Sequence, residues 1–295
     1  MVKLIKILAL PLLLAAILAA LIFAGCGGQT DGGGRNLTQQ ELEQLMSGSI
    51  AAYEDASSYA FTVDMDMSFE AIGGSSPGTM DITMRGEGEA DIVGNTMYMD
   101  LEMSLEQDFP GMEGSQGMSA EIYMLTDWMY MNLEVTGLGQ QWVKTPVTDE
   151  VKDAYNLNMV DQQLMPLESL GEVKLLRYES VDGSQCYVLD VLPNMDAMKA
   201  WFEEQELTSG TADWDVLVED MFNELSYIVW IDTDTNLLKK MSMVMDVDLT
   251  AEQAGATEED FDSLTLYAEV EMTLGEYNEP VTIDLPDEAQ DAIDM

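Results

Sequence analysis

The side chains that could carry chemistry in this sequence are methionine thioethers, carboxylates and two cysteine thiols, because the chain contains no histidine. Histidine is the commonest general base and the commonest metal ligand, so the usual routes to acid–base and metal-assisted catalysis are missing. Thioether sulfur is a ligand for Cu(I), and the 24 methionines include four Met-x-Met pairs, beginning at Met65, Met97, Met129 and Met243. Alternation in a methionine-rich strand produces such pairs automatically, and no cysteine cluster joins them. Cu(I) binding is therefore a minor hypothesis.

An acidic segment matches the start of a calcium-binding loop, with Asp232, Asp234 and Asn236 at the first three ligand positions. Leu237 stands where such a loop needs glycine, and Met243 stands where it needs a bidentate glutamate. We therefore interpret the segment as a hairpin turn whose Asp and Asn side chains bond to their own backbone, with Ca²⁺ binding as a second minor hypothesis.

The acidic residues do not identify a catalytic pair, because 56 Asp and Glu residues stand against only 11 Lys and Arg residues. The sequence contains no phosphate-binding loop or metal triad. Cys186 lies in a strand-like run without a histidine to activate it, and we expect it to be a small buried hydrophobe. The sequence therefore predicts a protein that is not an enzyme and that uses no cofactor.

The net charge of −45 also restricts the partners. A surface of this sign repels nucleic acid and anionic lipid headgroups, so nucleic acid is excluded as a partner. Cationic partners and divalent cations remain open, beside the plain interpretation that the charges keep the exterior solvated.

The elements that position these residues are segments of strict apolar–polar alternation. In the segment from Thr96 to Glu106, Met97 and Met99 fall on one parity while Tyr98 and Asp100 fall on the other. Alternation over this length predicts a β-strand with one dry face and one solvated face. Such a face must close around something apolar, which is a helix, a second sheet or a ligand.

The N-terminal residues are similar to the lipobox of bacterial lipoprotein signal peptides. Lys3 and Lys6 precede an apolar run over 7–23, which is followed by small residues and Cys26. The resemblance implies that residues 1–25 are a signal peptide and that Cys26 carries diacylglycerol. The apolar run exceeds a usual signal core, so an uncleaved membrane anchor is the alternative. Both interpretations place the rest of the chain outside the cytoplasmic membrane, anchored at the cell envelope.

Residues 26–36 are predicted to be the lipidated cysteine and a Gly-rich tether, and residues 37–295 a single domain. The domain is expected to open with a capped helix, because Thr38 and Glu41 form a capping box. An antiparallel meander follows, with a loop over 109–117 and no βαβ crossover.

The second half of the domain mixes helices and strands. The alternation stops over 148–170, where one or two short helices are expected, and amphipathic patterns predict further helices over 195–202 and 214–225. A hairpin then spans 227–249, and after the last long strand the segment 275–286 is expected to be an edge strand or an arm closed by proline.

The order of these elements resembles the LolA-like lipoproteins, including the LppX/LprG type. The resemblance is carried by Trp230-Ile231-Asp232 in the hairpin and by Pro280-Val-Thr-Ile283 in the closing arm. It implies an α+β fold in which a strongly curved antiparallel β-sheet, a half-barrel, wraps around a few α-helices. In that family the space between sheet and helices can hold acyl chains, and no catalytic motif exists to carry over. The resemblance thus implies a lipid or other long hydrophobic molecule as the ligand and leaves the protein partner unknown.

The methionine-rich dry faces are the predicted binding cavity, because methionine is flexible and suits a cavity that accepts variable apolar molecules. The alternative is a cell-envelope scaffold whose interior is packed by its own side chains and which holds no ligand. The residues predicted to line the cavity are Phe61, Val63, Met65, Met67, Met97, Met99, Leu101, Met103, Met129, Met131, Trp201, Met221, Met241, Met243, Met245, Leu266 and Val270.

Overall fold

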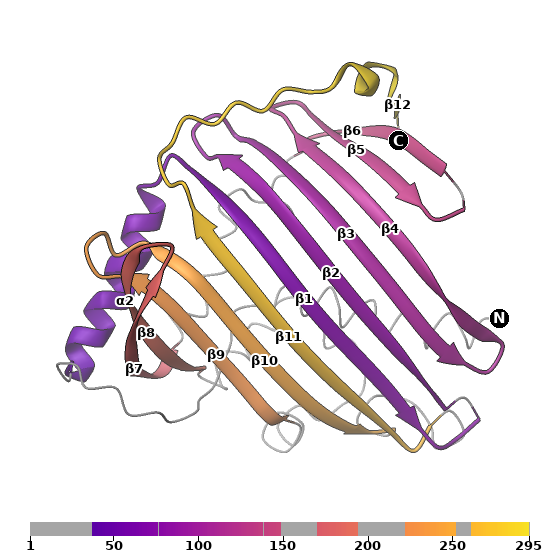
Figure 1. The fold of residues 1–295 in the computed structure, drawn as a ribbon, viewed down its shortest axis with the longest axis horizontal. Helices are drawn as coiled ribbons and strands as arrows, with labels where there is room; N and C mark the ends of the chain where they lie inside the picture. Colours follow the sequence, from indigo (N-terminus) through magenta and orange to yellow (C-terminus); the bar gives the residue numbers. More distant parts are fainter. Residues whose placement is uncertain are drawn as a thin grey trace.

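A computed structural model describes residues 37–75, 77–137, 139–148, 170–193, 222–251 and 261–294. These residues form one 12-stranded sheet with the strand order β12-β6-β5-β4-β3-β2-β1-β11-β10-β9-β8-β7, and a helix, α2 (Gln39–Glu54), beside one end of it (Figure 1). The strands are β1 (Ser58–Ile72), β2 (Gly78–Asp91), β3 (Thr96–Phe109), β4 (Met112–Met124), β5 (Trp128–Val135), β6 (Gly139–Pro146), β7 (Leu170–Val181), β8 (Ser184–Pro193), β9 (Phe222–Asp232), β10 (Leu238–Thr250), β11 (Ser263–Gly275) and β12 (Ile293–Asp294).

Hairpins build the sheet from both ends, and the two halves meet at β1. Strands β1–β6 form a continuous antiparallel meander, and β7–β11 form a second one. β1 pairs with β2 on one side and with β11 on the other, along its whole length. The expected antiparallel meander is therefore confirmed. The pairing of β12 with β6 is parallel and joins the C-terminal end to the far edge.

The helix α2 begins where the sequence predicts it. The Thr38 hydroxyl accepts a hydrogen bond from the Glu41 backbone N–H, and the Glu41 carboxylate accepts one from the Thr38 N–H at 2.8 Å. This reciprocal pair satisfies two donors that would otherwise lack a partner at the helix start. Leu42, Met46 and Tyr53 are buried against the sheet, so α2 covers part of one face.

We call the face of the sheet that packs with α2 the inner face, and the opposite one the outer face. Cross-strand register keeps alternate residues on one face, so the inner face of β1, β10 and β11 is a continuous apolar layer. At its centre, Met243 and Val270 are 1% exposed. The inner face therefore carries the main core of the described residues.

One crowded position of the inner face is occupied by glycine, which has no side chain. Gly88 of β2 lies between Phe61 and Met99 of the neighbouring strands. A Cβ at Gly88 would come within 2.6 Å of the Phe61 ring carbon Cζ and would also meet the Tyr98 carbonyl oxygen. The missing side chain lets the Phe61 ring lie across β2, which is a common role of glycine inside a strand.

After β11 the chain crosses the ends of the strands as an arm toward β6 (Figure 1). The Ser57 N–H donates to the Asn278 side-chain oxygen at 2.7 Å, and the Tyr277 hydroxyl donates to the Leu238 carbonyl at 2.6 Å. A 3₁₀ turn, η1 (Asp287–Asp291), leads into β12. The expected arm is confirmed, and the alternative of an edge strand over 275–286 is wrong because only Gly275 belongs to a strand.

Two expectations from the sequence are wrong at the level of elements. The predicted loop over 109–117 is a tight turn at Pro110 and Gly111, because β4 starts at Met112 and stays paired with β3. The predicted helix over 214–225 cannot include its last residues, because β9 starts at Phe222 and pairs with β10.

Only one α-helix lies among the described residues, so "a few helices" overstates the helical content of that part. The helices expected over 148–170 and 195–202 fall mostly or wholly outside the described residues. Within the described part, no helix is long and apolar enough to cross a membrane.

Candidate functional site

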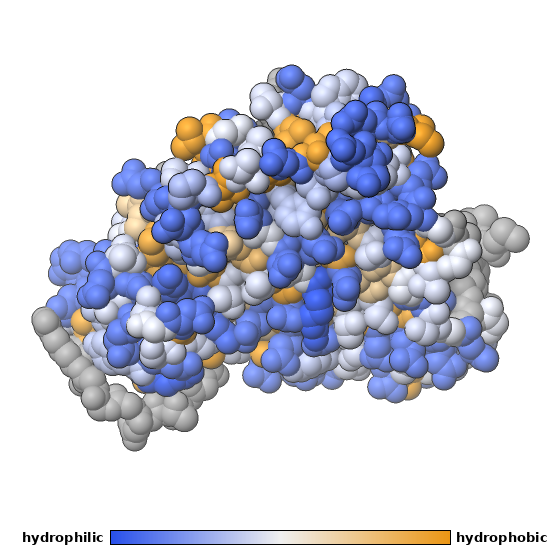
Figure 2. Space-filling model, turned by 45° about the horizontal axis from the view of Figure 1, so that its top comes forward, coloured by the Kyte–Doolittle hydropathy of each residue, from blue (hydrophilic) through white to orange (hydrophobic). Residues whose placement is uncertain are grey.

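The inner face is uncharged over half the sheet. On β1–β5 and β11, no position that pairs onto the inner face is Asp, Glu, Lys or Arg. The same strands carry their carboxylates on the outer face, as Asp64 and Glu102 illustrate, which lie on either side of Arg85 in one cross-strand row. In the space-filling view, hydrophilic residues accordingly cover most of the visible surface, with scattered hydrophobic ones between them (Figure 2).

Burial on the inner face falls from β1 toward β5. On β1 every inner position from Tyr59 to Ala71 is buried, whereas on β3 all inner positions beyond Met97 are partly exposed. Register makes the exposed positions contiguous, since Leu101 lies opposite Ala120, and Ala120 opposite Leu133. We call this surface the methionine–leucine patch; it consists of Met84, Met99, Leu101, Met103, Leu105, Ala120, Met131 and Leu133.

The predicted cavity residues divide between the core and the patch. The buried ones are Phe61, Val63, Met65, Met67, Met97, Met129, Met241, Met243, Met245, Leu266 and Val270. The partly exposed ones are Met99, Leu101, Met103 and Met131. Trp201, Met221 and Cys26 lie outside the described residues. That these residues line a cavity remains a prediction.

The predicted list of cavity residues omits half of the patch, namely Met84, Leu105, Ala120 and Leu133. Alternation places Leu105 and Leu133 on the dry face of their strands, and each of the four pairs onto the inner face. The difference between a buried and a partly exposed inner position depends on strand order in the sheet, which alternation does not reveal.

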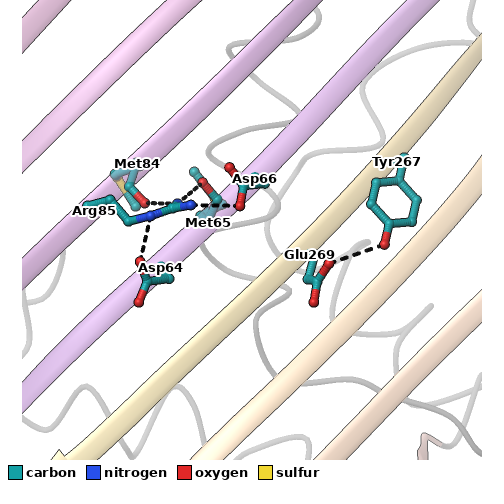
Figure 3. Close-up of polar contacts among 7 residues, drawn as sticks. All are labelled: Asp64, Met65, Asp66, Met84, Arg85, Tyr267 and Glu269. Carbon is teal, nitrogen blue, oxygen red and sulfur yellow. Dashed lines mark hydrogen bonds and ion pairs between the residues drawn. The ribbon is translucent and has the colours of Figure 1, made fainter.

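On the outer face, Arg85 binds two carboxylates of the neighbouring strand (Figure 3). Its Nε lies 2.6 Å from Asp64 Oδ1, and its Nη2 lies 2.8 Å from Asp66 Oδ2. The remaining terminal nitrogen donates to the Met65 carbonyl at 3.0 Å and to the Met84 carbonyl at 2.9 Å. Three of these four contacts go to β1, so the guanidinium is turned toward β1.

One row of the outer face, farther along the same strands, carries carboxylates directly opposite one another. Glu87 of β2 lies opposite Asp100 of β3, Asp100 lies opposite Glu121 of β4, and Glu121 lies opposite Asn132 of β5. We call these four residues the acidic row. Burial, together with the charges of Glu121, Glu102 and Glu87, raises the pKa of Asp100. Like charges placed opposite each other destabilise a sheet.

Aromatic rings border the acidic row at the next outer-face position of β3 and β4, and Trp142 of β6 lies opposite Asn132 at the end of the row. Tyr98 of β3 lies opposite Tyr123 of β4, with ring centroids 4.8 Å apart. Tyr123 also contacts Trp142 of β6, at 5.9 Å between centroids. Burial, and next the charge of Asp100, raises the pKa of Tyr98 to about 12. The phenol therefore stays neutral at physiological pH.

The two chemistry-bearing features weighed from the sequence prove structural. Asp232 Oδ1 accepts hydrogen bonds from the backbone N–H groups of Asp234 at 2.8 Å and Thr235 at 2.9 Å, which confirms the hairpin turn. Although burial opposes ionisation, these bonds lower the pKa of Asp232. Cys186 is buried, as expected, and burial raises the pKa of its thiol. Within the described ranges, no three His, Cys, Asp or Glu side chains are arranged to hold a metal ion.

Comparisons with known proteins give a family and a set of similar structures. A family model described as a family of unknown function, DUF6612, matches residues 41–294. No curated protein matches the chain.

Solved structures with a similar course of the chain include the lipoprotein LppX of Mycobacterium tuberculosis, at 12% identity and a TM-score of 0.44, covering 84% of this chain and 100% of LppX. LprF of Mycobacterium bovis matches at 14% identity and a TM-score of 0.44, covering 86% of this chain and 99% of LprF. A DUF1329 family protein of Desulfovibrio piger matches at 12% identity and a TM-score of 0.22, covering 83% and 95% of the two chains. The solved structures to which the chain is similar thus include two lipoproteins of the LppX type.

Proposed function

This chain belongs to the DUF6612 family, whose function is unknown, and we propose from its own geometry that it binds or carries a lipid or other long hydrophobic molecule. The ligand would lie against the methionine–leucine patch. The binding is non-catalytic and takes place outside the cytoplasmic membrane.

The observation that carries this proposal is the partial exposure of the patch. An apolar layer that served only as a core would be buried throughout, as it is on β1 and β11. On β3, Leu101, Met103 and Leu105 instead keep some of their surface accessible. A contiguous apolar surface that stays partly accessible is a common feature of binding sites.

The chemistry of the patch supports a hydrocarbon ligand. Its residues offer thioether and alkyl groups and no charge, so a charged group placed there would lose its hydration without a partner. Methionine side chains adjust to ligands of different shape, which fits binding to a class of lipids.

Attachment to the membrane completes the proposal. Lipidation of Cys26 and the tether over 26–36 would keep the sheet close to the bilayer that supplies or receives the ligand. The acidic outer face, with its net negative charge, would be repelled by anionic headgroups and would favour approach through other surfaces.

The test compares cargo on three forms of the full-length protein, each purified from the natural host in the same neutral detergent. Solvent extraction and mass spectrometry identify the acyl species that co-purify with the wild type. Met103→Gln places an amide in the patch and should reduce the bound lipid about tenfold, because an unpaired amide against hydrocarbon costs about 1–3 kcal/mol. Ser104→Gln, on the outer face of the same strand, is the matched control and should keep the cargo.

Three results decide between the functions. Acyl species on the wild type and the control, reduced in Met103→Gln, support a carrier and identify its ligand class. Apo wild-type protein that also fails to take up a fluorescent fatty-acid probe contradicts the carrier and leaves a packed scaffold. Equal loss in both variants contradicts binding at the patch.

A further inference from the structure

The acidic row on the outer face places three carboxylates next to one another, and among the described residues only Glu121 receives a side-chain hydrogen bond, from Asn132 of the row itself. Among the described residues, no Lys or Arg forms an ion pair with Glu87, Asp100 or Glu121. The cations of neighbouring rows are engaged elsewhere, since Arg85 is bound to β1 and Lys144 lies 3.2 Å from Asp294. The carboxylates of the row therefore repel one another, and no cation in the described part of the chain offsets this repulsion.

At the end of the row, a buried amide oxygen also lacks a hydrogen-bond donor. Asn132 is 5% exposed, and its Nδ2 donates to Glu121 Oε2 at 2.7 Å. Its Oδ1 is buried and has no hydrogen-bond partner. A buried acceptor left unpaired is costly, and it calls for a donor next to Glu121.

The aromatic border indicates which kind of donor fits. The rings of Tyr98, Tyr123 and Trp142 offer faces that attract organic cations and apolar surface against which methylene groups pack. A single inorganic ion needs several carboxylates converging on one point, and the acidic side chains of the described residues do not converge in that way. An extended cation meets both conditions.

We propose that the acidic row and its aromatic border bind a linear aliphatic polyamine. Adjacent strands lie about 4.8 Å apart, so the carboxylates of Glu87, Asp100 and Glu121 succeed one another at about that interval. A propylene or butylene spacer sets neighbouring ammonium groups of a polyamine at a comparable separation. The ammonium groups pair with the carboxylates, a terminal one lies at the Glu121 end of the row beside the Asn132 amide, and the spacers pack on the rings. This site lies on the face opposite the methionine–leucine patch and is independent of the lipid proposal.

The experiment is calorimetric titration of the full-length protein in neutral detergent with spermidine at low ionic strength, because salt screens such a site. Asp100→Asn removes the central carboxylate and should weaken binding about tenfold. Tyr123→Leu keeps an apolar side chain without the ring and should weaken binding about threefold. Glu106→Gln, on the same strand and face but outside the row, removes an equal charge and should change the affinity less than about twofold.

Thermal unfolding without spermidine verifies the fold of each variant, and Asp100→Asn should melt no lower than the wild type because it removes repulsion. Saturable binding with the stated order of variants supports the site. Equal losses in Asp100→Asn and Glu106→Gln indicate only a general attraction to an acidic surface and overturn the proposal. Absence of saturable binding, or displacement of spermidine by Mg²⁺ at equal concentration, overturns it as well.

Discussion

Truncating one methionine in the core and one in the patch tests whether the patch is packed like the core or is an open apolar surface. Met243 of β10 is 1% exposed and lies between Tyr227 and Val270 on the neighbouring strands. Met103 of β3 lies on the same inner face but is partly exposed. The two side chains are identical, so a difference between the substitutions reports their surroundings.

The expected costs follow from those surroundings. Met243→Ala removes a fully buried thioether chain and leaves a cavity, so the free energy of unfolding should fall by about 2–5 kcal/mol. At Met103 the surface is already open, which removes the cavity contribution. Met103→Ala should therefore lose only part of the transfer free energy, about 1 kcal/mol.

The measurement is urea unfolding of delipidated protein, followed by tryptophan fluorescence and by circular dichroism. Addition of the co-purified lipid should then stabilise the wild type through binding to the native state, and Met103→Ala should gain less from it. If Met103→Ala costs as much as Met243→Ala, the patch is packed like the core, and the reasoning from partial exposure is refuted.

Three further outcomes test separate parts of the structure. Asp232→Ala should cost about 1–3 kcal/mol at pH 7, because two backbone amides lose their acceptor. The pKa of Asp232 is lowered in the folded state, so this difference should hold above the ordinary value of 3.8 and disappear as pH falls through the folded value; a pH series of urea midpoints measures it. Asp100→Asn should raise the free energy of unfolding at neutral pH. This increase should vanish as pH falls through the raised pKa of Asp100, because the Asp100 carboxyl of the wild type then becomes neutral; an increase that persists at pH 3 would contradict this. Gly88→Ala should lower the melting temperature by overpacking worth about 1–3 kcal/mol, while Gly275→Ala, whose Cβ would meet nothing within 4 Å, should change little.

Local patterns predicted the faces and the helix start but not every boundary. The parity of Met97 and its neighbours placed them on the inner face, and the Thr38–Glu41 box placed the start of α2. The segment 109–117 reads as a loop because it is rich in glycine, yet β3 supplies a paired neighbour that holds it extended. Phe222 fits an amphipathic helix equally well, and only its pairing with β10 decides for a strand. In both cases a tertiary contact overrides local preference.

The candidate sites required information that no single segment contains. Met65 and Met103 both lie at apolar positions of alternating strands, but β1 pairs with β11 inside the buried layer, whereas β3 lies two strands away from β1 on the other side. Glu87, Asp100 and Glu121 form a row only through the registers of two hairpins. Spacing within one strand could indicate a polar face, but it could not indicate which carboxylates become neighbours.

The pairing of β1 with β11 has a consequence for how the chain folds as it is synthesised. Contacts within each meander are local, whereas the joint between the halves links residues as distant as Ser57 and Asn278, 221 positions apart. A chain that emerges N-terminus first must hold β1 with one edge unpaired until β11 arrives. Closure of this joint has high contact order and is expected to be the slow step of folding. Until then the unpaired edge of β1 is exposed to other chains, so slower closure of this joint should increase aggregation through edge-to-edge pairing.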